Sequence, residues 1–163
     1  MVVAEADGAK EATAEWLRSQ YRRYYATTKR ILPDRFGRRE FGFMFFTSSM
    51  VIRHLGFSRE QELNDFLTQR TPAHAYYSSA YYEKPGAPTM EEKGWLGADL
   101  IFDLDADHLM RGPYRAMLDR VKLETEKLLA MLTAELGFPE RDIHLVCSGG
   151  RGYHVHIREI GVR

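Results

Sequence analysis

Residues 98–107 read Ala-Asp-Leu-Ile-Phe-Asp-Leu-Asp-Ala-Asp, and this stretch decides the fold. Its even-numbered positions are all apolar, whereas its odd-numbered positions carry four aspartates and one isoleucine. Because side chains alternate between the two faces of a strand, the pattern predicts a strand over 99–105 with one face in the core and carboxylates on the other. Asp103 and Asp105 then share a face, with their Cα atoms about 6 to 7 Å apart.

Periodic stretches on both sides predict further elements. Helices are expected over 9–26 and over 114–136. A further helix is expected to follow Ser58, which would be its N-cap, with Gln61 at the capping-box position. Strands are expected over 40–47 and 50–54 (a hairpin), 143–147 and 154–157, and an extended chain over 75–82. The sequence therefore predicts an α+β fold with helices packed on a mixed β-sheet, rather than a doubly wound parallel sheet.

Length and composition set the class of protein. The 163 residues, 44% hydrophobic and 28% charged, suffice for one soluble domain with a core. The single cysteine, Cys147, excludes an internal disulfide and a zinc site built on paired cysteines. No stretch is long and apolar enough for a membrane span, and the N-terminus lacks the pattern of a signal peptide, so we expect an intracellular, cytoplasmic protein.

The charges are unevenly distributed although they sum to zero. Residues 18–39 contain eight bases and one acid, a net charge of +7, and residues 83–107 contain seven acids and two bases, a net charge of −5. A basic surface attracts phosphates and an acidic cluster attracts divalent cations. The pattern fits a polyanion handled next to a metal, and it also fits two solvated faces.

Asp103 and Asp105 are the candidate metal ligands. Like charges on one strand face repel one another unless a cation neutralises them, and hard oxygen ligands prefer Mg²⁺ or Mn²⁺. The alternative is a strand end with solvated acids. An iron site made of His154, His156 and Asp103 is disfavoured.

A glycine-rich turn, Ser148-Gly149-Gly150-Arg151-Gly152-Tyr153-His154, is the candidate phosphate site. It leads into a strand and not a helix, so it is neither a Walker loop nor a dinucleotide fingerprint. Its glycines let backbone N–H groups approach a ligand, and Arg151 adds a planar fork for phosphate oxygens. A glycine-rich hairpin with incidental polar residues is the alternative.

These motifs together resemble a known family. Residues 93–108 (KGWLGADLIFDLDADH), followed by residues 148–154 (SGGRGYH), closely resemble the catalytic small subunit of archaeal and eukaryotic DNA primase, and archaeal members most of all. The segments 39–43, 50–54 and 76–83 are also similar to segments of that family, so the resemblance covers about residues 15–160.

The resemblance implies a role for each matching residue. Asp103 and Asp105 would be catalytic and would bind two Mg²⁺ or Mn²⁺ ions. Residues of the glycine-rich turn and of the N-terminal hairpin would bind the nucleotide: Ser148, Gly149, Arg151, His154, Arg53 and Glu40. The implied reaction is two-metal nucleotidyl transfer by a DNA-directed RNA polymerase that builds short RNA primers on single-stranded DNA at the replication fork. The implied partners are nucleoside triphosphates and a large regulatory subunit.

Two departures from the family pattern matter. The family's third catalytic carboxylate lies well downstream of the glycine-rich motif, and Glu159 is too close to fill that role. We therefore expect residues 1–163 to be the N-terminal part of a single primase-like catalytic domain that is incomplete at its C-terminus, with residues 1–8 as a disordered tail. Residues 107–146 contain no cysteine, whereas many relatives carry a zinc element there, so we expect no structural zinc.

Two other functions remain open from the sequence. The polymerase domain of bacterial end-joining ligases shares the Asp-x-Asp strand and a similar glycine-rich turn, although residues 95–108 and the tyrosine-rich segment favour primase. A noncatalytic module that binds nucleotides or nucleic acid is also compatible with a missing third carboxylate.

Overall fold

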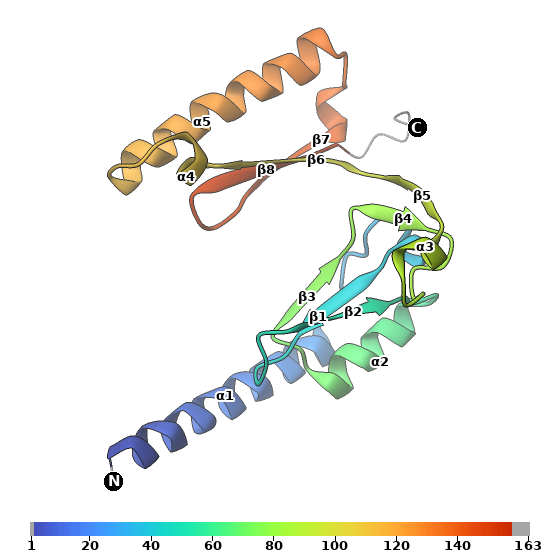
Figure 1. Ribbon diagram of the computed structural model, residues 1–163, viewed down its shortest axis with the longest axis vertical. Coiled ribbons are helices and arrows are strands. Elements are labelled where there is room, and N and C mark those ends of the chain that lie inside the picture. Colours follow the sequence, from blue (N-terminus) through green and yellow to red (C-terminus); the bar gives the residue numbers. More distant parts are fainter. Residues whose placement is uncertain (1, 158–163) are drawn as a thin grey trace. The chain divides into compact units, whose positions relative to one another are not determined.

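The computed structural model describes the backbone of residues 2–157 and the side chains of residues 11–157. The chain divides into two compact units between Gly97 and Ala98 (Figure 1). We call them unit 1 and unit 2 and describe each by itself. The single domain expected over 1–163 stays a prediction.

Unit 1 contains a long N-terminal helix, a three-stranded sheet and a two-stranded sheet. Its elements in chain order are α1 (Val2–Thr27), η1 (Phe36–Arg38), β1 (Phe41–Met44), β2 (Val51–Leu55), α2 (Glu60–Arg70), β3 (His74–Tyr77), β4 (Ala80–Tyr82), α3 (Met90–Lys93) and β5 (Trp95–Ala98). The larger sheet has the order β2-β1-β3 with antiparallel neighbours, and β4 pairs with β5. The expected hairpin is confirmed as β1 and β2, with a shorter first strand.

The core of unit 1 lies on one face of this sheet. Phe41 and Phe43 point from β1 toward Leu63 and Leu67 of α2, and all four are buried. Phe57 completes the cluster, so five buried apolar residues join the sheet to the helix. Clusters of this kind stabilise a fold because they remove apolar surface from water.

Two predicted helix boundaries in unit 1 differ from the structure. Helix α1 begins at Val2, whereas the sequence predicts its start at Ala9; residues 2–9 contain three alanines, the residue with the highest helix propensity. The disordered tail expected over 1–8 stays a prediction. Helix α2 has Arg59, not Ser58, as its N-cap. The carboxylate of Glu62, rather than the side chain of Gln61, accepts hydrogen bonds from the backbone N–H groups of residues 58 and 59, at 2.9 and 3.3 Å.

Unit 2 is a three-stranded sheet with one long helix. Its elements are β6 (Leu100–Asp105), α4 (Ala106–Leu109), α5 (Tyr114–Ala130), the π-helical turn η2 (Met131–Glu135), η3 (Glu140–Asp142), β7 (Ile143–Cys147) and β8 (Gly152–Ile157). The predicted long helix thus changes to π-helical geometry after Ala130. Gly137, the predicted C-cap, has a φ of 73°.

The sheet of unit 2 has the order β6-β8-β7, and both pairings are antiparallel. The predicted mixed sheet is therefore wrong for the pairings observed in either three-stranded sheet, whereas the α+β class is confirmed. The reason lies in the connections. Helix α5 links β6 to β7, which run in the same direction, but β8 folds back as a hairpin and inserts between them (Figure 1).

The predicted core face of β6 is confirmed. Leu100, Phe102 and Leu104 pack against a buried cluster of Leu132, Val155 and Ile157. The even-numbered side chains of β6 thus face the helix and the odd-numbered ones face the other way, which places the aspartates away from the core.

Candidate metal and nucleotide site

The two predicted metal ligands lie on the face of the unit 2 sheet that is opposite the core. Asp103 is paired in register with His154 of β8, and the His154 Nε2 atom lies 3.4 Å from the Asp103 Oδ1 atom. The Asp103 side chain is 72% exposed, whereas His154 is 39% exposed. A carboxylate this exposed can exchange water for a cation at little desolvation cost.

Asp105 lies at the end of β6, opposite Gly152. Its Oδ1 atom accepts a hydrogen bond of 3.0 Å from the backbone N–H of Asp107 and so caps the short helix α4. Within the described part of the chain, the Oδ2 atoms of Asp103 and Asp105 accept no hydrogen bond. Each aspartate therefore keeps one oxygen for another ligand.

The glycine-rich turn connects β7 to β8 beside these aspartates. The Ser148 hydroxyl accepts hydrogen bonds from the N–H groups of Gly150 and Gly152, at 3.3 and 3.2 Å. The Tyr114 hydroxyl donates to the Gly150 carbonyl at 2.9 Å. Ser148 thus holds the turn in shape, a role that the sequence interpretation did not give it.

Two glycines of the turn are required by its geometry. Gly149 has a φ of 75°, the left-handed region, and no atom lies within 4 Å of where a Cβ would be, so a ligand can approach its backbone. Gly152 is buried against β6, and a Cβ there would lie 2.1 Å from the Leu104 carbonyl oxygen. The close approach of β8 to β6 therefore depends on glycine at this position.

Arg151 lies in the glycine-rich turn, at the end of the sheet where Asp105 lies, and its side chain is paired with that of Asp107. Its Nη1 atom donates to the Asp107 Oδ1 and Oδ2 atoms at 2.7 and 3.0 Å, and both side chains are about half exposed. The hydrogen bond and charge of Asp107 raise the pKa of Arg151. A phosphate can thus bind the remaining nitrogens of the fork or displace Asp107.

Glu40 and Arg53, the other predicted nucleotide-binding residues, lie together in unit 1. The Arg53 guanidinium donates to both Glu40 carboxylate oxygens, at 3.1 and 3.4 Å, and the N–H of His54 donates to Oε1 at 3.0 Å. Glu40 is only 4% exposed, whereas Arg53 is 56% exposed. Arg53 is therefore the member of the pair that solvent and ligands reach.

Lys93 is a residue that the sequence interpretation missed. It is fully buried, its Nζ atom lies 3.5 Å from Glu40 Oε2, and it donates a hydrogen bond to the Pro85 carbonyl. Burial raises the pKa of Glu40, but the hydrogen bonds from His54 and Arg53 and the positive charges of Lys93 and Arg53 outweigh it, so the pKa lies below its ordinary value. The sequence offered one indication that Lys93 matters, since Lys93 and Gly94 begin the segment that resembles the primase family.

The structure thus gathers the predicted residues into two groups. Unit 2 brings together Asp103, Asp105, Ser148, Gly149, Arg151 and His154, and unit 1 brings together Glu40 and Arg53. Among the described residues, no three histidine, cysteine, aspartate or glutamate side chains are grouped so as to hold a metal ion. The donor set at Asp103 and Asp105 is two carboxylates, which suits a hard divalent cation that keeps several other oxygen ligands.

No helix in the described part of the chain has the length and apolar character that crossing a membrane requires.

Comparison with known proteins gives a consistent result. The model of the family described as DNA primase small subunit matches residues 102–163. The protein named DNA primase small subunit PriS from Methanosphaerula palustris is 55% identical over 157 residues, which are 94% of this chain and 42% of that protein. Those named in the same way from Methanoregula boonei and Methanospirillum hungatei are 54% and 51% identical, over 93% and 94% of this chain and 42% and 41% of their own length. The chain thus spans about two-fifths of the length of these curated relatives.

Proposed function

The chain belongs to the family of DNA primase small subunits, and from this premise we propose that it contributes metal- and nucleotide-binding residues to the catalytic subunit of a DNA primase. The whole subunit would act as a DNA-directed RNA polymerase that makes short RNA primers on single-stranded DNA during replication. The names of the relatives favour this function over the polymerase domain of an end-joining ligase.

One observation carries the proposal. Two carboxylates with an unengaged oxygen each, Asp103 and Asp105, lie on one sheet face next to a glycine-rich turn that presents an arginine and a histidine. Carboxylates hold divalent cations, and arginine and backbone N–H groups hold phosphates. A nucleoside triphosphate with its cation needs both kinds of group within a few ångströms.

The residues have distinct tasks in this reaction. A ribonucleotide 3′-hydroxyl would attack the α-phosphate of the incoming nucleotide, and pyrophosphate would leave. Mg²⁺ or Mn²⁺ held by Asp103 and Asp105 would stabilise charge on the attacking and leaving oxygens. Arg151 and His154 would bind the phosphate oxygens, and the rigid turn around Gly149 would keep backbone N–H groups close to them. Arg53, whose guanidinium is held by Glu40, would also bind the nucleotide, as the family resemblance implies.

The whole protein's partners follow from the same proposal. They are single-stranded DNA as template, nucleoside triphosphates as substrates and a large regulatory subunit, the counterpart that a small subunit implies. A place at the replication fork in the cytoplasm belongs to this proposal as well.

Metal-dependent nucleotide binding tests the proposal. The double variant Asp103→Asn, Asp105→Asn removes both metal ligands, so we expect the Mn²⁺-dependent affinity for a nucleoside triphosphate to fall by about tenfold or more. Paramagnetic broadening of the backbone signals of residues 152–156 should disappear with it. Asp119→Asn, an exposed aspartate on α5, is the matched control and should change neither measurement. Unchanged broadening in the double variant would contradict the assignment.

A further inference from the structure

The β2-β1-β3 sheet of unit 1 has a second face, opposite the phenylalanine core. We call it the outer face and define it by Gly42, Val51, Arg53, His74 and Tyr76. In register, Gly42 is opposite Tyr76, and the core residue Phe41 is opposite Tyr77. Because residues directly opposite each other share a face, His74 and Tyr76 lie on the side that Leu63 and Leu67 do not cover.

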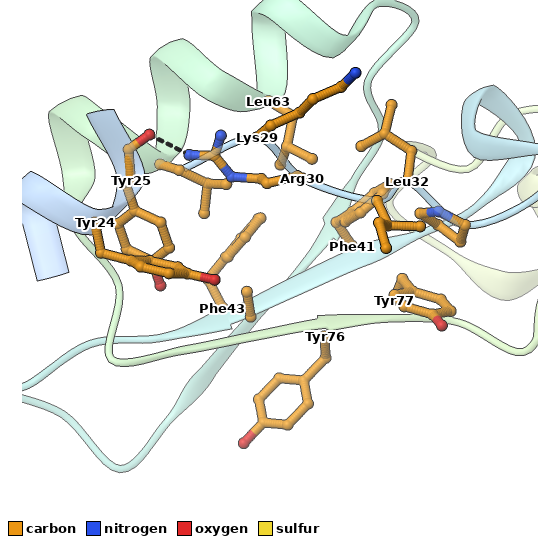
Figure 2. Close-up of a pocket in the computed structure, with 14 residues that line it drawn as sticks. Tyr24, Tyr25, Lys29, Arg30, Leu32, Phe41, Phe43, Leu63, Tyr76 and Tyr77 are labelled. Carbon is orange, nitrogen blue, oxygen red and sulfur yellow. Dashed lines mark hydrogen bonds between the residues drawn. The ribbon is translucent and has the colours of Figure 1, made fainter. Parts of the chain in front are cut away.

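Neighbouring tyrosines of β3 point to opposite sides of the sheet. Figure 2 shows Tyr77 on the side of Phe43, where a pocket of about 420 Å³ lies, and the ring of Tyr76 on the other side. The two rings are almost equally exposed, 49% for Tyr77 and 47% for Tyr76. Tyr77 contacts Phe41 and the Arg39 guanidinium, so its ring belongs to the packing of unit 1.

The ring of Tyr76 is stacked on the ring of His74. Their centroids are 6.1 Å apart and their planes are inclined by only 12°. Both residues are exposed, so the outer face presents two nearly parallel aromatic planes to solvent. Nearly parallel rings that solvent reaches are the usual platform on which unpaired bases stack.

On the neighbouring strand β1, the residue opposite Tyr76 is covered by side chains of β2. Gly42 has no side chain, and a Cβ there would lie 3.1 Å from Val51 Cγ1 and 3.8 Å from Arg53 Cγ. Val51 and Arg53 therefore border the glycine from β2, on the same face as Tyr76. The aliphatic part of the Arg53 side chain thus lies over Gly42, on the strand next to Tyr76.

The outer face also carries a positive charge. Arg53 is 56% exposed and lies two strands away from Tyr76, a distance of about 10 Å between strand axes. Its guanidinium is held in place by Glu40, which is buried. A fixed cation at this distance from a stacking surface complements the phosphate of a neighbouring nucleotide.

We propose that the outer face binds single-stranded nucleic acid, with unpaired bases stacked on Tyr76 and His74 and a backbone phosphate near Arg53. The inference rests on the proposed function, which requires a single strand, and it adds a base-stacking site that the sequence motifs do not contain. A strand is favoured over a free nucleotide because two parallel rings continue the stack of successive bases, whereas one nucleotide needs only one ring.

Fluorescence of the base analogue 2-aminopurine tests the site. The 163-residue chain is titrated, without divalent cations, into a short oligothymidylate with one central 2-aminopurine, whose emission is quenched when the base stacks. We expect Tyr76→Leu to weaken binding by about tenfold, which corresponds to the contribution of one stacked base, and to abolish the quenching. Tyr76→Phe should keep both, because stacking needs the ring and not the hydroxyl.

Tyr77→Leu is the matched control, since it removes a tyrosine of equal exposure from the adjacent position and the opposite face. Circular dichroism confirms that each variant is folded. Full quenching by the Tyr76→Leu variant, or an equal loss in the control, would overturn the proposal. The measurement uses neither metal nor turnover, so it can fail while the Asp103 and Asp105 test succeeds, and the reverse also holds.

Discussion

The two units contain charged residues in different environments. In unit 1, Glu40 and Lys93 are 4% and 0% exposed, and each is satisfied by protein partners. In unit 2, Asp103 is 72% exposed, and Arg151 and Asp107 are about half exposed. Buried charges need partners from the protein because burial removes their hydration, whereas exposed charges stay solvated and can exchange water for a ligand. The contrast separates charges that hold the fold from charges that can bind.

The largest loss of stability is expected from removing a buried charge. Glu40→Gln leaves the ammonium of Lys93 buried without an anion, so we expect the free energy of unfolding of unit 1 to fall by about 3 kcal/mol. Urea denaturation followed by tyrosine fluorescence measures this loss. Glu62→Gln, at a partly exposed carboxylate on α2, is the comparison and should cost much less.

The same variant should change the dependence of stability on pH. The pKa of Glu40 is lowered in the folded chain from 4.5, so its contribution to stability is complete above that pH and is lost as the pH falls through the folded-state pKa. The Glu40→Gln variant should lose this acid-induced decrease. An identical pH profile in both proteins would show that the network does not stabilise the fold.

A smaller loss of stability is expected from substitution of two glycines in unit 2. In unit 2, Gly152→Ala would place a Cβ 2.1 Å from the Leu104 carbonyl oxygen, so β8 must move away from β6. We expect the free energy of unfolding of unit 2, measured by thermal denaturation, to fall by about 2 to 3 kcal/mol. Gly149→Ala, where only the left-handed φ of 75° opposes a side chain, should cost about 1 kcal/mol. Equal losses would show that the close approach of the strands is not what requires glycine.

The smallest effect on stability is expected at an exposed ion pair of unit 2. Asp107→Asn breaks the exposed pair with Arg151, and we expect no measurable change in the thermal unfolding midpoint. Triphosphate binding should instead become tighter, because the guanidinium no longer has a competing carboxylate. Isothermal titration measures this change, and weaker binding would mean that Asp107 orients Arg151 for its ligand.

Short-range patterns determined a large part of this structure. The alternation over residues 98–107 predicted both the strand and its buried face, and β7 has the bounds that the sequence predicts. The glycine-rich turn was predicted as a connection between two strands and is one. These features follow from neighbours a few residues apart, because side-chain alternation and turn geometry are local properties.

Tertiary structure decided what depends on residues far apart in the chain. The insertion of β8 between β6 and β7, which makes the sheet antiparallel, is set by pairing over about fifty residues and not by any local pattern. The burial of Lys93 against Glu40 and the pairing of Arg151 with Asp107 are likewise invisible to periodicity. The sequence by itself identified the chemical groups, Asp103, Asp105, Arg151 and Glu40 among them. Only the fold decided which of these charges lost water to protein partners and which kept it, since desolvation depends on everything packed around a group.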